Sequence, residues 1–263
     1  MQVLAAGLTD IGKKRKTNQD AIYVNLEKNF FVVADGMGGH NGGDIASAMA
    51  VKCIPEYLLE HYSEDPIHLM RNSIRYANAA IHKKAKQDVK LDGMGTTSVA
   101  LLFKHDTRPE GNGQAVVVYL ANVGDSRCYL VNSHQLYQMS ADHSLVQEKL
   151  ALSIIGGIGE YTRENAAVDP QKNIIVRTVG FEENVDVDVF TYKVSKNDML
   201  LICSDGLHGR VSDRDILHTV NTHVPSPAES TKENLQTAVK ALIDLANHNG
   251  GNDNISVVLV LAK

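Results

Sequence analysis

The chain has 263 residues, of which 43% are hydrophobic and 22% charged, and its formal net charge is −5. This composition is typical of a globular protein that can bury a core, and the acidic balance argues against nucleic acid as a partner. The 3 cysteines form no Cys-x-x-Cys pair, no apolar run approaches the ~20 residues of a membrane helix, and no basic segment opens a signal peptide. We therefore expect a cytoplasmic protein that contacts neither membrane nor nucleic acid.

The first half of the chain predicts strands, then two helices, then strands again. Strand-like segments cover residues 3–8, 21–26 and 30–34, and a Gly-rich turn over 36–43 follows them. The second helix is the clearer, because Pro66 suits its first turn and its apolar residues step by three and four: Ile67, Met70, Ile74, Ala77 and Ile81. Strand patterns return over 96–103, 115–122, 127–131 and 135–139.

The second half is less regular at first. Residues 141–172 contain a short helix near 145–152 and the hinge-like run Gly156-Gly157-Ile158-Gly159, so we expect a flap there. Further strands are expected over 174–179, 185–189, 199–203 and 255–261. A late helix presents one apolar face made of Leu235, Ala238, Val239, Leu242 and Ala246.

This order of elements predicts an α+β fold. Consecutive strands joined by short turns pair in antiparallel fashion, and helices that cluster apart from the strands form separate layers. About ten strands are too many for one open sheet, so we expect two packed sheets.

Five aspartates stand beside small or turn-forming residues: Asp20, Asp35, Asp125, Asp205 and Asp253. Each one alone is typical of a turn, and Asp253 alone also fits a helix C-cap. Asp35 and Asp205, however, directly follow apolar strand patterns, so their carboxylates emerge at strand ends. Hard divalent cations bind carboxylate and carbonyl oxygens, and a neighbouring Gly lets a carbonyl approach the ion. The set predicts a metal site with more than one ion.

Two other interpretations fail on the residues. The run Gly36-Met37-Gly38-Gly39-His40-Asn41 lacks the last glycine of a dinucleotide-binding motif. Cys203 as a phosphatase nucleophile would need an Arg after five intervening residues, where Gly209 stands and Arg210 comes one position too late. Cys203 ends an apolar run, which favours a buried structural thiol.

Six motifs occur in the order of the metal-dependent serine/threonine protein phosphatases (PPM, type 2C). They are Arg15-x-x-Asn18-Gln19-Asp20, Asp35-Gly36-Met37-Gly38-Gly39-His40, Gly93-Met94-Gly95-Thr96-Thr97, Gly124-Asp125-Ser126-Arg127, Ser204-Asp205-Gly206 and Gly251-x-Asp253-Asn254. The chain resembles the compact bacterial branch of that family over residues 7–260. The resemblance implies a four-layer α-β-β-α sandwich, two antiparallel sheets flanked by helices, and one catalytic domain over 1–263 with a flap at 141–172.

The resemblance also implies two core Mg²⁺ or Mn²⁺ ions in a cleft, with a weaker third ion. Asp35 resembles the carboxylate that bridges the two core ions, and Gly36 resembles the residue that offers its carbonyl. Asp205 and Asp253 resemble the remaining carboxylates of the first ion. Asp125, together with Asp205, resembles the site of the third ion.

Arg15 resembles the arginine that binds phosphate, and Asp20 resembles an acid that contacts an ion directly or through water. The chain departs from the family in two places that bear on proton transfer: Met37 replaces a His of some relatives, and Asp169-Pro170 replaces a His-Pro of the flap. His40 is therefore our candidate for the general acid, with a hydrogen-bonded turn residue as the equal alternative. Position 19 is Gln where many relatives have Glu, so it would reach metal only through water.

The implied activity is hydrolysis of phosphoserine and phosphothreonine in proteins, by a water activated between the ions. The expected partner is a phosphorylated protein, with a Ser/Thr kinase as the opposing enzyme, and the chain is expected to be a monomer. Two alternatives stay open: a non-catalytic signalling module on the same fold, and a metallohydrolase of small phosphoesters. Thr96 and Thr97 are interpreted as strand packing.

Overall fold

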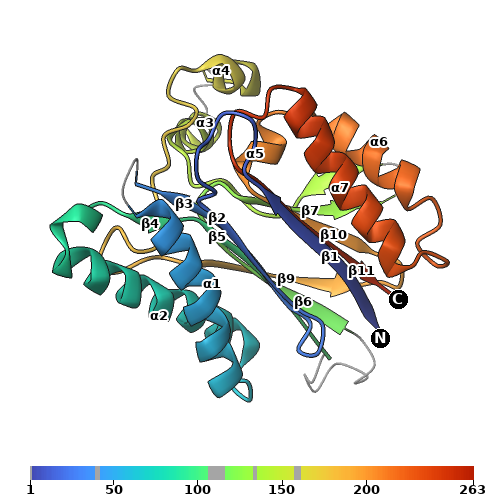
Figure 1. The fold of residues 1–263 in the computed structure, drawn as a ribbon, viewed down its shortest axis with the longest axis horizontal. Coiled ribbons are helices and arrows are strands. Elements are labelled where there is room, and N and C mark those ends of the chain that lie inside the picture. Colours follow the sequence, from blue (N-terminus) through green and yellow to red (C-terminus); the bar gives the residue numbers. More distant parts are fainter. Residues whose placement is uncertain (1, 39–41, 106–115, 133–134, 157–160) are drawn as a thin grey trace.

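The computed structural model describes residues 2–38, 42–105, 116–132, 135–156 and 161–263. Its strands form two antiparallel sheets (Figure 1). Sheet I contains, in spatial order, β1 (Val3–Asp10), β11 (Ile255–Ala262), β10 (Met199–Cys203), β7 (Arg127–Val131) and β8 (Leu136–Gln138). Sheet II contains β2 (Asp20–Asn25), β3 (Phe30–Met37), β5 (Ser98–His105), β6 (Val116–Val123) and β9 (Asp188–Val194), and the short β4 (Gly95–Thr96) pairs with β3.

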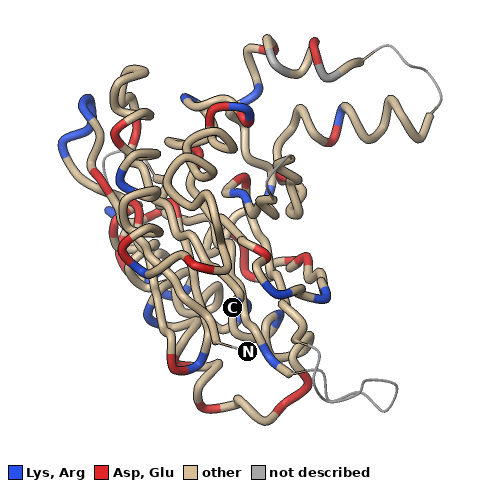
Figure 2. The backbone as a smooth tube through the Cα atoms, turned by 90° about the vertical axis from the view of Figure 1, so that its right-hand side faces the viewer, with Lys and Arg blue, Asp and Glu red and all other residues tan. Residues whose placement is uncertain are grey.

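Helices cover the outer face of each sheet. Against sheet II pack α1 (Gly43–Glu60) and α2 (Pro66–Gln87), and a 3-10 turn (Val89–Leu91) follows α2. Against sheet I pack α6 (Asp213–His223) and α7 (Lys232–His248), while the single turn α5 (Asp205–His208) directly follows β10. The predicted α-β-β-α sandwich is therefore confirmed, with α3 (Leu145–Ile155) and α4 (Arg163–Val168) projecting from its body at the upper right of Figure 2.

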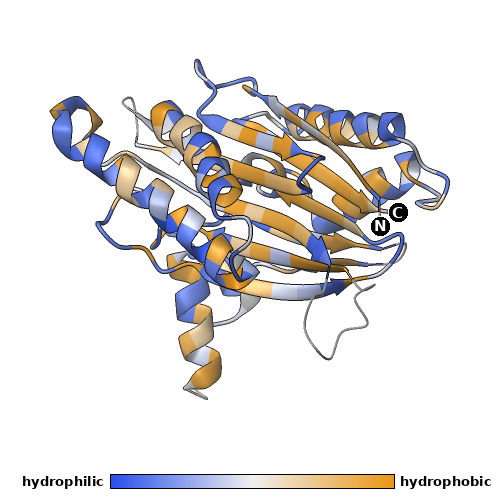
Figure 3. Ribbon diagram, turned by 90° about the horizontal axis from the view of Figure 1, so that it is seen from below, coloured by the Kyte–Doolittle hydropathy of each residue, from blue (hydrophilic) through white to orange (hydrophobic). Residues whose placement is uncertain are grey.

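The alternation of side chains along the strands explains the layers. On β3, Phe30, Val32 and Ala34 face the helices, whereas Phe31 and Val33 face sheet I. Successive side chains of a strand point to opposite faces, so a strand covered on both sides is apolar throughout. Figure 3 shows this as continuous hydrophobic colour along the central strands.

Helix α2 begins and packs as its sequence predicts. The Asp65 carboxylate caps it by accepting the N–H groups of Ile67 and His68, and Pro66 occupies the first turn. Ile74 and Ile81 are among the residues of the predicted face that are fully buried against sheet II.

Two predicted strands were wrong. Residues 174–179 form only isolated bridges, from Ile175 to Ser144 and from Val179 to Thr96. The alternation over 185–189 reflects burial of Val185 and Val187 in the core beneath α2, and the ladder to β6 begins only at Asp188. Helix α6 was not predicted, although Ser212 caps it and Ile216 and Val220 give it an apolar spacing of four.

Among the described residues, none of the helices combines the length and the apolar character that crossing a membrane requires.

Candidate metal centre

The five aspartates of the predicted site lie at the same end of the sandwich. Asp20 opens β2 and stands opposite Asp35 on β3. Asp205 follows β10, Asp253 precedes β11, and Asp125 lies in the turn between β6 and β7. In an antiparallel sheet the start of one strand lies beside the end of its neighbour. The five aspartates therefore lie at the same end of the strands, although they come from five separate parts of the chain.

A pair of serines links Asp20 to the other sheet. The Ser204 hydroxyl donates to Asp20 Oδ2 at 2.7 Å and accepts the N–H of Ser256 at 3.0 Å. Ser204 immediately precedes Asp205, so the same contact sets the acids of β2 and of α5 beside each other. Neither serine was assigned a role from the sequence, because the contact spans 184 positions.

Burial and mutual repulsion raise the pKa values of this cluster. Burial, and then the charges of Asp205 and Asp253, raise the pKa of Asp20 to about 6. The pKa of Asp35 lies well above its usual value, first through burial and then through the charge of Asp20. Burial, followed by the charge of Asp205, raises the pKa of Asp125 to about 7. A cation at this position would favour the charged forms that burial disfavours.

Negatively and positively charged neighbours both shift the pKa of the Asp205 carboxyl. Burial raises its pKa first, followed by the charge of Asp253, whereas a hydrogen bond with the Asp35 carboxyl and the charges of Arg15 and Arg210 lower it. The carboxyls of Asp35 and Asp205 therefore influence each other's protonation, as two acids beside one cation site would.

Three carboxylate oxygens of the cluster are buried without a hydrogen-bond partner. Asp20 Oδ1, Asp125 Oδ1 and Asp205 Oδ1 make no hydrogen bond with any residue that the structure describes. Burying such an oxygen without a partner is costly, which fits a site built for cations. Within the described ranges no three His, Cys, Asp or Glu side chains enclose one ion by themselves, so backbone and water oxygens would have to complete its coordination.

The backbone at Asp35 and Gly36 is held in place from three sides. The Gly36 N–H donates to the Gln19 carbonyl at 3.0 Å. The Asp35 N–H donates to the Thr97 hydroxyl at 3.0 Å, and the Thr96 hydroxyl donates to the Asp35 carbonyl at 2.8 Å. A Cβ at Gly36 would overlap the carbonyl oxygen of Gly43, so only glycine fits. Thr96 and Thr97 are buried as predicted, and they also position the Asp35 backbone, which the sequence did not indicate.

Arg15 points at the cluster and contacts Asp253. Its Nη2 lies 2.6 Å from Asp253 Oδ2, with about half of the Arg15 side chain exposed (49%). The hydrogen bond that Arg15 donates to Asp253 raises the pKa of Arg15, which keeps the guanidinium charged. Asn254 holds the loop that carries Arg15, because its amide donates to the carbonyls of Ile11 and Thr17 and accepts the N–H of Gln19.

The comparisons with known proteins decide the family. The sequence profile described as protein phosphatase 2C matches residues 12–244. The chain belongs to the protein phosphatase 2C family. The serine/threonine phosphatase Stp of Listeria monocytogenes is 37% identical to it over 259 residues, which cover 96% of this chain and 93% of the relative.

Solved structures of bacterial phosphatases agree in fold with this protein phosphatase 2C. The Mycobacterium tuberculosis serine/threonine phosphatase PstP/Ppp superimposes with a TM-score of 0.83 at 28% identity, with 100% of both chains covered. The catalytic domain of PstP in complex with two manganese ions superimposes with a TM-score of 0.79 at 28% identity, with 99% of each chain covered.

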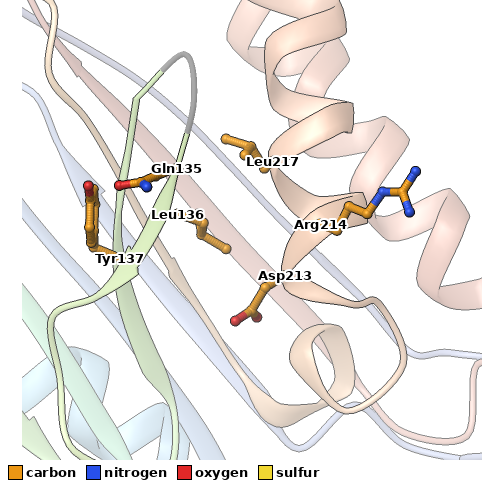
Figure 4. A pocket seen from close by; sticks show the side chains of 6 residues that line it. All are labelled: Gln135, Leu136, Tyr137, Asp213, Arg214 and Leu217. Carbon is orange, nitrogen blue, oxygen red and sulfur yellow. The ribbon is translucent and has the colours of Figure 1, made fainter.

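A groove of about 1030 Å³ runs along the acidic cluster of this phosphatase. Asp125, Asp205 and Asp253 line one side of it, and Val146 and Leu150 of α3 line another. A smaller pocket of about 390 Å³ between β8 and α6 adjoins it and shares Leu136, Tyr137 and Asp213 with its lining (Figure 4). Asp125, Asp205 and Asp253 therefore face a depression that is bounded by the predicted flap segment.

The remaining predicted residues fall in different places. His40 lies outside the described residues. Cys203 is fully buried and burial raises the pKa of its thiol, which confirms the structural interpretation. His208, which the sequence did not single out, lines the groove and places its Nε2 3.1 Å from the Asp125 carbonyl.

Proposed function

We propose that this protein phosphatase 2C hydrolyses phosphoserine and phosphothreonine in proteins with the help of Mg²⁺ or Mn²⁺. One observation carries the proposal: aspartates from five parts of the chain meet at one end of the sandwich, three of them line a groove there, and three of their buried oxygens lack a hydrogen-bond partner among the described residues. Relatives that share more than a third of their residues with this chain are named serine/threonine phosphatases, which supports the same reaction.

We assign the ion-binding oxygens to Asp35, the Gly36 carbonyl, Asp205 and Asp253, and a weaker third ion to Asp125 with Asp205. The two manganese ions of the PstP catalytic domain support two core ions here. Mg²⁺ and Mn²⁺ retain several waters, which suits a cluster that offers few protein ligands at any one point. When bound, a pair of such ions supplies an activated water for attack on phosphorus.

The protein's own residues prepare the substrate. Arg15 presents a planar fork that matches two phosphate oxygens, and its contact with Asp253 holds the fork beside the cluster. Asp20, held by Ser204, is assigned to contact an ion directly or through water. His40 stays our prediction for the group that protonates the leaving alkoxide. Residues 141–172 are proposed as the flap of one catalytic domain over 1–263.

Phosphate release from a phosphoserine peptide tests the proposal. Release should require Mn²⁺ or Mg²⁺ and stop in excess chelator, and activity that persists in chelator would refute it. Cys203→Ser should remain active, which separates the metal mechanism from a thiol mechanism. Turnover of a nucleotide above that of the peptide would favour the small-phosphoester alternative. The non-catalytic alternative is disfavoured because Asp35, Asp205 and Asp253 are all present.

We place the enzyme in the cytoplasm, where it would act as a monomer on proteins phosphorylated by a Ser/Thr kinase. Its three cysteines are free thiols, as a reducing compartment allows. Light scattering of the purified protein tests the monomer, and a mass near twice that of one chain would contradict it.

A further inference from the structure

His143 forms two hydrogen bonds with Gly124, the residue before Asp125, one with its carbonyl and one with its N–H. Gly124 has a φ of 103°, a left-handed conformation that glycine adopts readily. The His143 N–H donates to the Gly124 carbonyl at 3.0 Å, and the Gly124 N–H donates to His143 Nδ1 at 3.0 Å. His143 is therefore both a main-chain and a side-chain partner of the same residue.

These contacts fix the protonation of His143. Because Nδ1 accepts a hydrogen bond, the neutral ring must carry its proton on Nε2, which lies 3.2 Å from Asp188 Oδ2. Arg177 Nη1 donates to the other oxygen of Asp188 at 2.9 Å and also lies 3.1 Å from His143 Nε2. A guanidinium nitrogen cannot accept, so this second contact is not a hydrogen bond when Nε2 carries the proton. Burial lowers the pKa of His143, which favours the neutral ring.

His208 holds the same turn from the opposite side. Its Nε2 lies 3.1 Å from the Asp125 carbonyl oxygen, which can only accept, so Nε2 is the donor. His208 ends α5, the turn of helix that begins with Asp205. The contact therefore connects the backbone of Asp125 to α5, the helix that carries Asp205.

We propose that His143 and His208 are positioning residues that together orient Asp125 toward Asp205. Asp125 Oδ1 has no hydrogen-bond partner among the described residues, and the hydrogen bond that lowers the pKa of this carboxyl comes from the backbone of Asp125 itself, so the direction of the carboxylate follows its backbone. The inference rests on the proposed function, in which Asp125 and Asp205 hold the weaker ion.

The same contacts connect Asp125 to the segment that carries α3 and α4. Asp142, next to His143, accepts three hydrogen bonds from Arg127, at 3.0, 3.1 and 2.7 Å. Residues 124–127 and 141–143 thus run side by side as one bonded unit.

Paired substitutions separate positioning from simple packing. His143→Asn retains an acceptor near the place of Nδ1, whereas His143→Leu removes it. His208→Gln retains a donor near the place of Nε2, whereas His208→Leu removes it. His82→Leu is the matched control, because the His82 ring also contacts backbone carbonyls, those of Gly180 and Phe181, but not the turn at Asp125.

The readouts are the Mn²⁺ concentration for half-maximal phosphopeptide hydrolysis, and Mn²⁺ binding by calorimetry. Both Leu variants should raise that concentration by about tenfold, since each leaves a buried polar group unpaired. The Asn and Gln variants should lie within about threefold of wild type, and the tightest calorimetric binding step should be unchanged in all of them. Leu variants with the metal dependence of wild type would overturn the proposal.

Nitrogen-15 spectra of the imidazoles in the metal-free protein give a test that needs neither activity nor a variant. They should show a proton on Nε2 of each ring and none on Nδ1 of His143. A proton on Nδ1 of His143 would overturn the proposed positioning role, even if the enzyme is active. A wild-type protein without metal-dependent turnover would instead refute the proposed function, while the spectra still decide whether the two rings hold the turn.

Discussion

Asp20 and Asp35 stand directly opposite each other on β2 and β3 as a non-hydrogen-bonded pair. The bond from the Gly36 N–H to the Gln19 carbonyl, one position beyond on each strand, defines the pair as this type, in which facing side chains lie closest. Like charges at such positions repel, and both carboxyls sit in a buried cluster. The fold therefore stores electrostatic strain in this cluster, and a bound cation would relieve it.

The metal-free protein should lose stability as the pH rises from about 4 through about 7. The folded-state pKa values of Asp20 and Asp125, about 6 and about 7, exceed the ~3.9 of an unfolded aspartate. The folded state therefore binds more protons through this range, and the free energy of unfolding falls as the pH rises. His143 and His208, whose pKa values are lowered, oppose this trend only below about pH 6.5, where an unfolded histidine gains its proton.

Thermal unfolding in chelator should thus show a midpoint a few degrees lower at pH 8 than at pH 6.5. Mg²⁺ at pH 8 should recover the difference, and Asp125→Asn should shrink it in the metal-free protein. A midpoint that rises with pH in chelator would contradict the raised pKa values.

Asp205→Asn should abolish turnover and weaken metal binding. The amide removes a charge from a cluster whose other acids remain, and it replaces one of the unpartnered oxygens that we assign to the ions. We expect a loss of about 10²-fold or more in kcat, with Mn²⁺ affinity by calorimetry reduced in parallel. Asp213→Asn, at a groove position outside our ligand assignment, is the control. Turnover within about threefold of wild type, well under 1 kcal/mol, would mean that Asp205 is not a ligand.

Arg15→Ala should mainly weaken the use of substrate. Its contact with Asp253 is half exposed, so its loss should change stability by less than ~1 kcal/mol and leave the unfolding midpoint nearly unchanged. The loss of a two-pronged phosphate contact should raise KM by about tenfold, and Arg15→Lys should restore only part of it. Lys14→Ala, at the exposed neighbouring position, is the control. A fall in kcat with KM unchanged would assign Arg15 a different role.

The positions of the acids at strand ends could be predicted from the sequence, but the residues that hold them in place could not. Asp35 and Asp205 each follow an apolar run that is typical of a buried strand. Their position at strand ends could therefore be predicted from the local sequence. The link between Asp20 and Ser204, by contrast, depends on how the two sheets stack, which no local pattern encodes. The contacts of His143 and His208 with the turn at Asp125 are likewise long-range, and neither histidine stands in a recognisable motif.

The misplaced strand at 185–189 has a similar cause. Alternation shows that Val185 and Val187 are buried while their neighbours are exposed, but it does not identify what covers them. Here the cover is the core beneath α2, and the backbone joins a ladder only from Asp188 onward. A period of two reports burial on one side, which a strand shares with an extended segment lying across a helix.

Gly36→Ala should damage both the fold and the site. An added Cβ would overlap the Gly43 carbonyl and lie 2.6 Å from the Gln19 carbonyl, so either the start of α1 or the β2–β3 pair must move. We expect a loss of about 2 kcal/mol in the free energy of unfolding, together with weaker Mn²⁺ binding, because the Asp35–Gly36 backbone is displaced. Gly93→Ala is the matched control, since nothing lies within 4 Å of its added Cβ and only its φ of 78° is strained. Urea unfolding and Mn²⁺ calorimetry of both variants decide the matter: if Gly36→Ala loses no more stability or metal affinity than Gly93→Ala, the close approach of α1 to this backbone is not what holds the site.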